Sequence, residues 1–373
     1  MENDMDPIQA YLDDFGKVTA IINRNQNNGA AAGFYLSDET GDVLECVIAG
    51  VEEHHDCVRY YLTIPTTYDF AKAYVLWNAY GLHTPLIVRF IVQTDEFDRL
   101  FTYDGNDLGA LYHPAYTDFA VWAPTAQEAS VRIYRKDGSS LAWAMRRGEK
   151  GVWRIRIQED LKQATYIYVL HHNGEAISTT DPYALSSTAY GHRSAVIDIS
   201  ELEKIKDESI LPEFKSYTDA ILYECSVRDM TSSPDTGSKE HGTFKALAES
   251  GTSRQKEPSG LEHIVSLGVS HVQLQPVNDF ATVDEQNPQR SYNWGYDPTC
   301  WMTLEGSYTD SPMDPYARMK EFRHLVACMH ARGLRVNADV VFNHMYDAYD
   351  CNLNRIVPYY YFRYTDRQYL SNG

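Results

Sequence analysis

The stretch DPYARMKEFRHLVACMHARGLRVNADVVFNH, residues 314–344, predicts a helix followed directly by a buried strand. Asp314 suits the N-cap of the helix, Pro315 its first position and Gly333 the residue beyond its end. LRVNADVVF (334–342) then has the apolar, β-branched composition of a strand. Between Asp314 and Gly333, apolar residues at helical spacing form one stripe; they are Met319, Phe322, Leu325, Val326 and Met329.

The same alternation of strand and helix extends upstream to residue 221. ILYECSV (221–227) and VSHVQLQPV (269–277) are near-continuous apolar runs, which predicts strands buried on both faces. Between them GLEHIVSLG (260–268) has apolar residues at helical spacing. Residues 278–314 are predicted to form a long loop. Strands and helices in this order predict parallel βα units.

Two architectures accept parallel βα units. A doubly wound sheet that binds a nucleotide needs a glycine-rich turn after its first strand, and the segment 228–237, RDMTSSPDTG, has none. A (β/α)8 TIM barrel keeps its chemistry in loops at the C-terminal strand ends. The polar residues gather at those ends, which favours the barrel; they are Arg228, Asp229, Gln275, Asn278, Asp279, Asp339, Asn343 and His344.

The first 200 residues have the pattern of antiparallel β-domains. Short strand-like runs such as KVTAIINR and CVRYYLTIP, separated by turn residues, predict a first β-sandwich over residues 1–112. A second β-sandwich is predicted over 113–200, with a hairpin turn at Lys136-Asp137-Gly138. The charged stretch 201–219 is interpreted as a linker. The predicted fold is therefore multidomain, with β-sandwich domains followed by an incomplete barrel over 220–373.

Two tryptophans of the second β-domain leave their role open. Trp143 and Trp153 are suited to stacking on a sugar ring, but buried tryptophans are common in β-sandwiches. A core position is the favoured interpretation for both.

Composition excludes several classes of partner. The formal net charge of −19 disfavours nucleic acids and anionic membranes, because polyanions are repelled. No run of eighteen apolar residues occurs, and the acidic start MENDMDPIQAYLDDF lacks an export signal, so a cytoplasmic protein is expected. The six scattered cysteines are expected to be reduced thiols. No cofactor is predicted and no metal-ligand set, for calcium or any other ion, is readable.

Two motifs resemble a known family. YNWGYDP (292–298) and DVVFNH (339–344) resemble the corresponding motifs of type I pullulanases, in the α-amylase superfamily of glycoside hydrolases. The resemblance is nearly end to end: the segment 104–126 resembles the entry into a family 48 carbohydrate-binding module. It implies a debranching enzyme that hydrolyses α-1,6-glucosidic linkages of pullulan, glycogen or starch-derived dextrins by a retaining mechanism. The implied partner is an α-glucan.

The resemblance also implies roles for single residues. Period two along the third strand places Arg335, Asn337 and Asp339 on one face, with Asp339 nearest the C-terminal end. In the family the matching residues position one sugar, which implies substrate binding by Tyr296, Asp339 and His344. Supporting roles in the surrounding loops are predicted for Asn343, Asp297 and Trp294.

The catalytic carboxyl groups are expected to lie beyond the end of this chain. Retaining glycosidases use two carboxyl groups about 5–5.5 Å apart, and the resemblance implies a nucleophilic Asp on the fourth strand and an acid Glu after the fifth. Residues 221–373 are too few for a full barrel of roughly 250 residues. The chain is therefore expected to be truncated after the third strand and inactive alone. A non-catalytic α-glucan-binding truncation product and an isoamylase-like or branching-enzyme-like relative remain alternatives.

Overall fold

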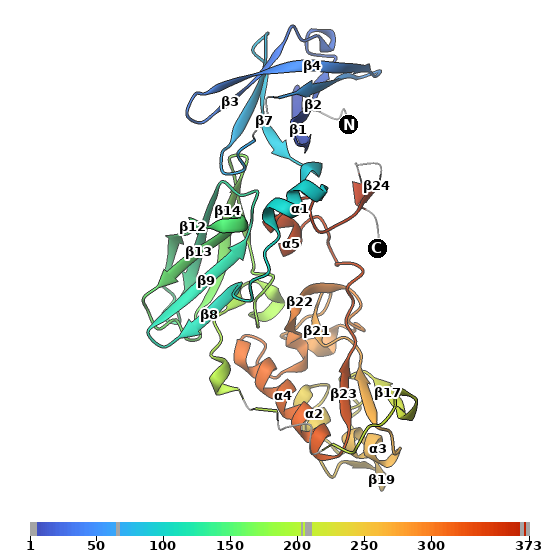
Figure 1. Ribbon diagram of the computed structural model, residues 1–373. Helices are drawn as coiled ribbons and strands as arrows, with labels where there is room; N and C mark the ends of the chain where they lie inside the picture. The colour runs from blue at the N-terminus through green and yellow to red at the C-terminus, as the bar shows by residue number, and fades with distance from the viewer. Residues whose placement is uncertain (1–5, 65–67, 203, 206–210, 366–368, 371–373) are drawn as a thin grey trace.

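The structure, a computed structural model, describes residues 6–64, 68–202, 204–205, 211–365 and 369–370. A barrel, a β-sandwich and an α/β unit follow one another along the chain and lie in that order from top to bottom in Figure 1. The predicted linker 201–219 falls partly outside the described residues. Within the described ranges, no helix is both long enough and apolar enough to cross a bilayer.

The first unit is a closed barrel, so the predicted β-sandwich over residues 1–112 is wrong for this domain. Its strands hydrogen bond in the order β1-β2-β5-β4-β3-β6-β7, and β7 returns to pair with β1 in parallel. Alternate residues along β1, such as Ala10 and Leu12, point into an apolar interior. The strands are β1 (Ile8–Asp14), β2 (Lys17–Asn23), β3 (Phe34–Asp38), β4 (Val43–Glu53), β5 (Cys57–Thr63), β6 (Tyr74–Asn78) and β7 (His83–Val88).

Strand β4 explains why the sheet closes. Its first residues pair with β3 and its last seven with β5, and the register shifts between Ile48 and Gly50. Such a bulge bends a strand and increases its twist, so one strand can turn the corner of a barrel. After β7 the chain continues through the short helix α1 (Asp95–Phe101), which the sequence interpretation did not predict.

The second unit is the predicted sandwich. One sheet has the order β12-β13-β9-β8 and the other β11-β10-β14-β15, with β16 added beside β14. β8 pairs with β9, so the predicted division after residue 112 falls within a strand of this unit. The strands are β8 (Gly109–His113), β9 (Tyr116–Trp122), β10 (Glu128–Tyr134), β11 (Ser140–Ala144), β12 (Arg146–Arg147), β13 (Val152–Ile157), β14 (Thr165–His172), β15 (Glu175–Thr179) and β16 (Ser194–Ala195).

The third unit contains a parallel sheet of three strands, β17 (Leu222–Cys225), β20 (His271–Leu274) and β23 (Arg335–Ala338). Helices α2 (Phe244–Ala248), α3 (Gly260–Ser266) and α4 (Pro315–Ala331) pack on it through an apolar cluster that includes Val272, Leu274 and Leu325. The side chain of Asp314 caps α4 by accepting a hydrogen bond from the Tyr316 amide, and Gly333 has φ +77°, as its place beyond the helix end requires.

The prediction that ILYECSV is buried on both faces is wrong for the described residues. Tyr223 and Cys225 face the helices, but Leu222 is 50% exposed and Glu224 is also exposed on the opposite face. In register with Glu224 on that face lie Gln273 and Asn337. Successive side chains of a strand point to opposite faces, so each face must be assessed from every second residue. The overall apolar composition of the run did not show that one face is polar.

Residues 278–314, predicted as a loop, contain regular structure. β21 (Asn278–Phe280) and β22 (Pro298–Leu304) form an antiparallel pair in this region. Short pairs also occur between β18 (Ser253–Arg254) and β19 (Glu257–Pro258), and between β24 (Tyr364–Thr365) and β25 (Tyr369–Leu370).

The last segment of the chain returns to the first two units. After β23 it forms α5 (Asn352–Ile356), which contacts β15 of the second unit. Tyr360 donates a hydrogen bond to the Asp98 carboxylate at 2.9 Å and packs edge-on against Trp122. The three units are therefore joined by contacts between residues distant in sequence. All six cysteines are free thiols, as predicted.

Candidate functional site

The structure brings Tyr296, Asp339 and His344 together. The Tyr296 hydroxyl donates to Oδ2 of Asp339 at 2.9 Å, and Nε2 of His344 lies 2.7 Å from the Tyr296 carbonyl oxygen. Asp339 follows β23 directly, and its amide extends the sheet by donating to the Leu274 carbonyl. The three residues therefore lie at the C-terminal ends of parallel strands, the edge at which barrel enzymes place their chemistry.

Protonation at this group follows from its contacts. Burial, followed by the hydrogen bond to Asp339, raises the pKa of Tyr296 to about 12, so its hydroxyl remains a donor at neutral pH. A backbone carbonyl only accepts, so Nε2 of His344 carries a proton. That nitrogen is already used, and Nδ1 faces the side chain of Asn343 at 3.2 Å. Both ring nitrogens of His344 therefore have partners within the protein.

The loop that carries Tyr296 is held by Asn293. Its amide donates to Asp297, to the Ala281 carbonyl and to the Thr282 hydroxyl within 3.0 Å, and its side-chain oxygen accepts from the Gly295 amide. Gly295 has φ +90°, and a Cβ there would lie 2.9 Å from the Cβ of Pro276. The loop conformation therefore requires glycine at this position.

The residues predicted to support this loop differ in their environments. Asp297 accepts from Asn293 and from the Thr282 hydroxyl, and its carbonyl accepts from the Ala281 amide, so it ties both ends of the loop. Trp294, by contrast, is 61% exposed. A role for Trp294 in packing the loop interior is therefore not supported by its position.

Two residues near the site were missed in the sequence. Glu224 accepts hydrogen bonds from Gln273 and Gln275 at 3.3 and 3.2 Å, and its charge contributes to the raised pKa of Tyr296. A lone carboxylate inside the apolar run ILYECSV was the available signal. Asn293, which holds the loop, lies inside the motif YNWGYDP, but no local pattern indicates how many partners an asparagine has.

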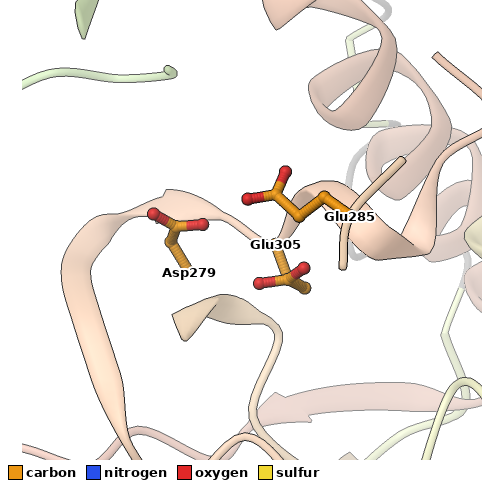
Figure 2. A group of neighbouring side chains, drawn as sticks. All are labelled: Asp279, Glu285 and Glu305. Atoms are coloured by element: carbon orange, nitrogen blue, oxygen red, sulfur yellow. The ribbon is translucent and has the colours of Figure 1, made fainter. Parts of the chain in front are cut away.

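A separate group of three carboxylates is buried in the third unit. Ligand oxygens of Asp279, Glu285 and Glu305 all lie within 4.8 Å of one another, and Figure 2 shows the three side chains converging. We call these three residues with Arg318 the carboxylate cluster. Arg318 is 0% exposed; its guanidinium donates to Glu285 at 3.1 Å and to the Leu304 carbonyl at 2.7 Å, and lies 3.9 Å from Asp279.

Hydrogen bonds from the protein stabilise the carboxylates of the cluster. Glu305 accepts from the amides of Phe280 and Ser307, and Asp279 accepts from the Thr299 hydroxyl. The Arg318 guanidinium supplies one positive charge beside Glu285 and Asp279. One positive charge does not balance three negative ones, and a buried unpaired charge is costly. Burial and, next, the charge of Glu285 raise the pKa of Asp279 to about 7, which indicates that the cluster retains a proton near neutral pH.

Comparisons with known protein families match the first two units. Residues 8–93 match the pullulanase N1-terminal domain, which covers the barrel. Residues 107–184 match carbohydrate-binding module 48, the isoamylase N-terminal domain, which covers the sandwich.

Similarity to individual proteins extends over the whole chain. A pullulanase of Bacillus subtilis strain 168 is 35% identical over 370 residues, which cover 98% of this chain and 50% of the relative. The crystal structure of a pullulanase from Anoxybacillus sp. LM18-11 matches with a TM-score of 0.93 at 36% identity over 98% of this chain and 52% of that one. The same enzyme complexed with maltotriose matches with a TM-score of 0.92, also at 36% identity and with the same coverage. The chain thus spans about half the length of these relatives. It has the N-terminal domains of the pullulanase family and corresponds to the N-terminal portion of a type I pullulanase.

Proposed function

We propose that this chain is the α-glucan-binding part of a debranching glycosidase that hydrolyses α-1,6-glucosidic branch linkages. In this proposal β17, β20 and β23 are the first three strands of a (β/α)8 barrel, preceded by the closed barrel, the β-sandwich and a linker over 201–219. The contact of Tyr296 with Asp339 and His344 at the C-terminal strand ends carries the proposal. It is supported by the maltotriose that the Anoxybacillus pullulanase binds in its crystal structure.

The chemistry of these residues suits the positioning of a sugar ring. Tyr296 is 36% exposed, so part of its aromatic face is open to stack on the apolar face of a hexose. The Asp339 carboxylate has acceptor capacity beyond the Tyr296 hydroxyl and can accept from sugar hydroxyls. Positioning lowers the barrier only when a nucleophile and an acid are also present. We therefore propose that residues 1–373 alone bind glucan without cleaving it.

Reducing-sugar release from pullulan tests this proposal. Residues 1–373 alone are expected to show none above the blank. The same residues joined to the C-terminal half of the Bacillus subtilis pullulanase are expected to show turnover. In that joined protein Asp339→Asn is expected to lower kcat/KM by about a hundredfold. Turnover by residues 1–373 alone would contradict the assignment of their role.

Two alternative functions predict different products. A branching-enzyme-like protein would transfer chains and release no reducing sugar, and an isoamylase-like protein would act on glycogen in preference to pullulan. Product analysis of the joined protein on pullulan and on glycogen separates these outcomes. If the joined protein folds, binds maltotriose and cleaves neither glucan, the non-catalytic binding function is the correct one.

A further inference from the structure

A cavity of about 500 Å³ lies between the second and third units. We call it the interdomain cavity. One wall comes from the second unit, residues 167, 178–180 and 190–192, and the other from the third, residues 298–299, 345–347, 350–352 and 355. Its volume is within the range of small-ligand sites. It adjoins the candidate site along the chain on both sides, because Pro298 follows Tyr296 by two residues and Tyr346 follows His344 by two.

The wall from the second unit is held in a strained conformation. Tyr190 has φ +60° and ψ +20°, a left-handed backbone that costs a bulky residue about 1–3 kcal/mol. Its amide donates to Glu285 of the carboxylate cluster, and its hydroxyl donates to Asp284 at 2.7 Å. Two anchors on the third unit thus fix a conformation that Tyr190 would otherwise avoid. Strain of this kind is concentrated at ligand sites, where it fixes the geometry before the ligand arrives.

The wall from the third unit is fixed by Arg355. Its guanidinium donates to Asp350 at 2.7 Å and crosses to the Ser178 carbonyl of the second unit at 2.8 Å. The Tyr346 amide donates to the Pro298 carbonyl at 2.9 Å, which ties this wall to β22. Both walls are therefore held by hydrogen bonds, and the cavity is preformed.

The lining combines aromatic faces with polar groups. Tyr190 is 40% exposed and Tyr346 57% exposed, and beside them lie Asp347, Asn352 and His192. Tyrosine stacks on the apolar face of a sugar ring, and carboxylate and amide groups bind its hydroxyls. Of the two aspartates in the lining, Asp350 pairs with Arg355 and Asp347 keeps its negative charge, and the chain has a net charge of −19, so an anionic ligand is disfavoured. A neutral, polyhydroxylated ligand fits this chemistry.

We propose that the interdomain cavity binds a second segment of α-glucan, beside the candidate site at Tyr296, Asp339 and His344. This inference rests on the proposed function, because that function supplies the glucan. The second unit then contributes directly to substrate binding through Tyr190, and the carboxylate cluster acts as a positioning element for that residue.

Calorimetric titration of residues 1–373 with maltotetraose tests the inference. The unmodified chain is expected to bind two equivalents. Ser178→Trp places a large side chain at an exposed strand position that lines the cavity, and is expected to leave one. Ser140→Trp is the matched control, because it alters an exposed serine on the edge strand at the opposite side of the same sheet. It is expected to leave both equivalents.

A second cavity variant tests the same site in case Ser178→Trp does not fold. Tyr346→Ala changes an exposed loop residue and is expected to weaken one of the two sites by about tenfold or more. His344→Ala is expected to remove the other equivalent. Loss on His344→Ala with no change in either cavity variant would overturn the cavity and leave the proposed function standing. Loss only in the cavity variants would support the cavity and contradict the candidate site. Absence of binding to the unmodified chain would overturn both.

Discussion

Arg318 is fully buried. Replacing it by methionine leaves an unbranched side chain at this position but removes the guanidinium. The carboxylate cluster then has no cation. The carbonyl oxygens of Leu304 and Pro312, which accept from Arg318 at 2.7 and 3.0 Å, also lose their donor. Breaking a buried ion pair by removing one partner costs about 3–5 kcal/mol. We expect a loss of this size for Arg318→Met, larger at pH 8 than at pH 5, because protonation of the carboxyl groups offsets part of the excess negative charge.

Hydrogen exchange followed by mass spectrometry resolves this loss by region. The opening free energy of amides in α4 and β22 should fall by about 3–5 kcal/mol, while that of β2 in the barrel should not change. Arg332→Met is the matched control. Arg332 also pairs with a glutamate, Glu262, but the two side chains are 35% and 23% exposed, so a loss below about 1 kcal/mol is expected. If Arg318→Met changes the opening of α4 by no more than this control does, the guanidinium does not stabilise the cluster.

Three further outcomes are expected. Asp279 has a raised pKa of about 7, caused first by burial, so the wild-type free energy of unfolding should fall as pH rises from about 5 to about 8; Asp279→Asn should flatten that dependence in urea titrations, and an unchanged slope would contradict it. Gly295→Ala should destabilise its loop by about 1–3 kcal/mol and weaken maltotetraose binding, measured by exchange and calorimetry; wild-type exchange in this loop would contradict it. Trp153→Phe should lower thermal stability through the lost hydrogen bond to the Ala123 carbonyl, yet leave maltotetraose affinity unchanged; reduced affinity would indicate a sugar platform.

Local patterns predicted the elements that are amphipathic or well punctuated. The helix α4 begins after Asp314 and ends before Gly333 as its sequence indicates, because capping and apolar spacing are local properties. The strands of the sandwich were likewise readable from period two. The closure of the first barrel was not, because it depends on the parallel pairing of Ala10 with Leu86 and on a bulge in β4. Neither feature can be recognised from the pattern of about ten neighbouring residues in the sequence.

The candidate site was predictable to a similar extent. The motifs located Tyr296, Asp339 and His344, which the structure brings within hydrogen-bonding distance. They did not indicate that a ring nitrogen of His344 is hydrogen-bonded to the Tyr296 carbonyl oxygen. The carboxylate cluster was missed because its members come from four separate segments of the third unit. Arg318 lies at helical spacing with Phe322, Leu325 and Met329, on the buried side of α4, but this spacing does not indicate its carboxylate partners.

The pairing of the first strand of the barrel with the last has a consequence for how the nascent chain folds. β1 leaves the ribosome first, but one of its edges stays open until Leu86 and Val88 have been synthesised. Closing so long a segment costs chain entropy before any contact between its ends offsets it. We therefore expect the barrel to form late and in a single step, once β7 has emerged, and to be protease-sensitive in arrested nascent chains that end before residue 88. Folding of the barrel would then be complete while the sandwich is still being translated.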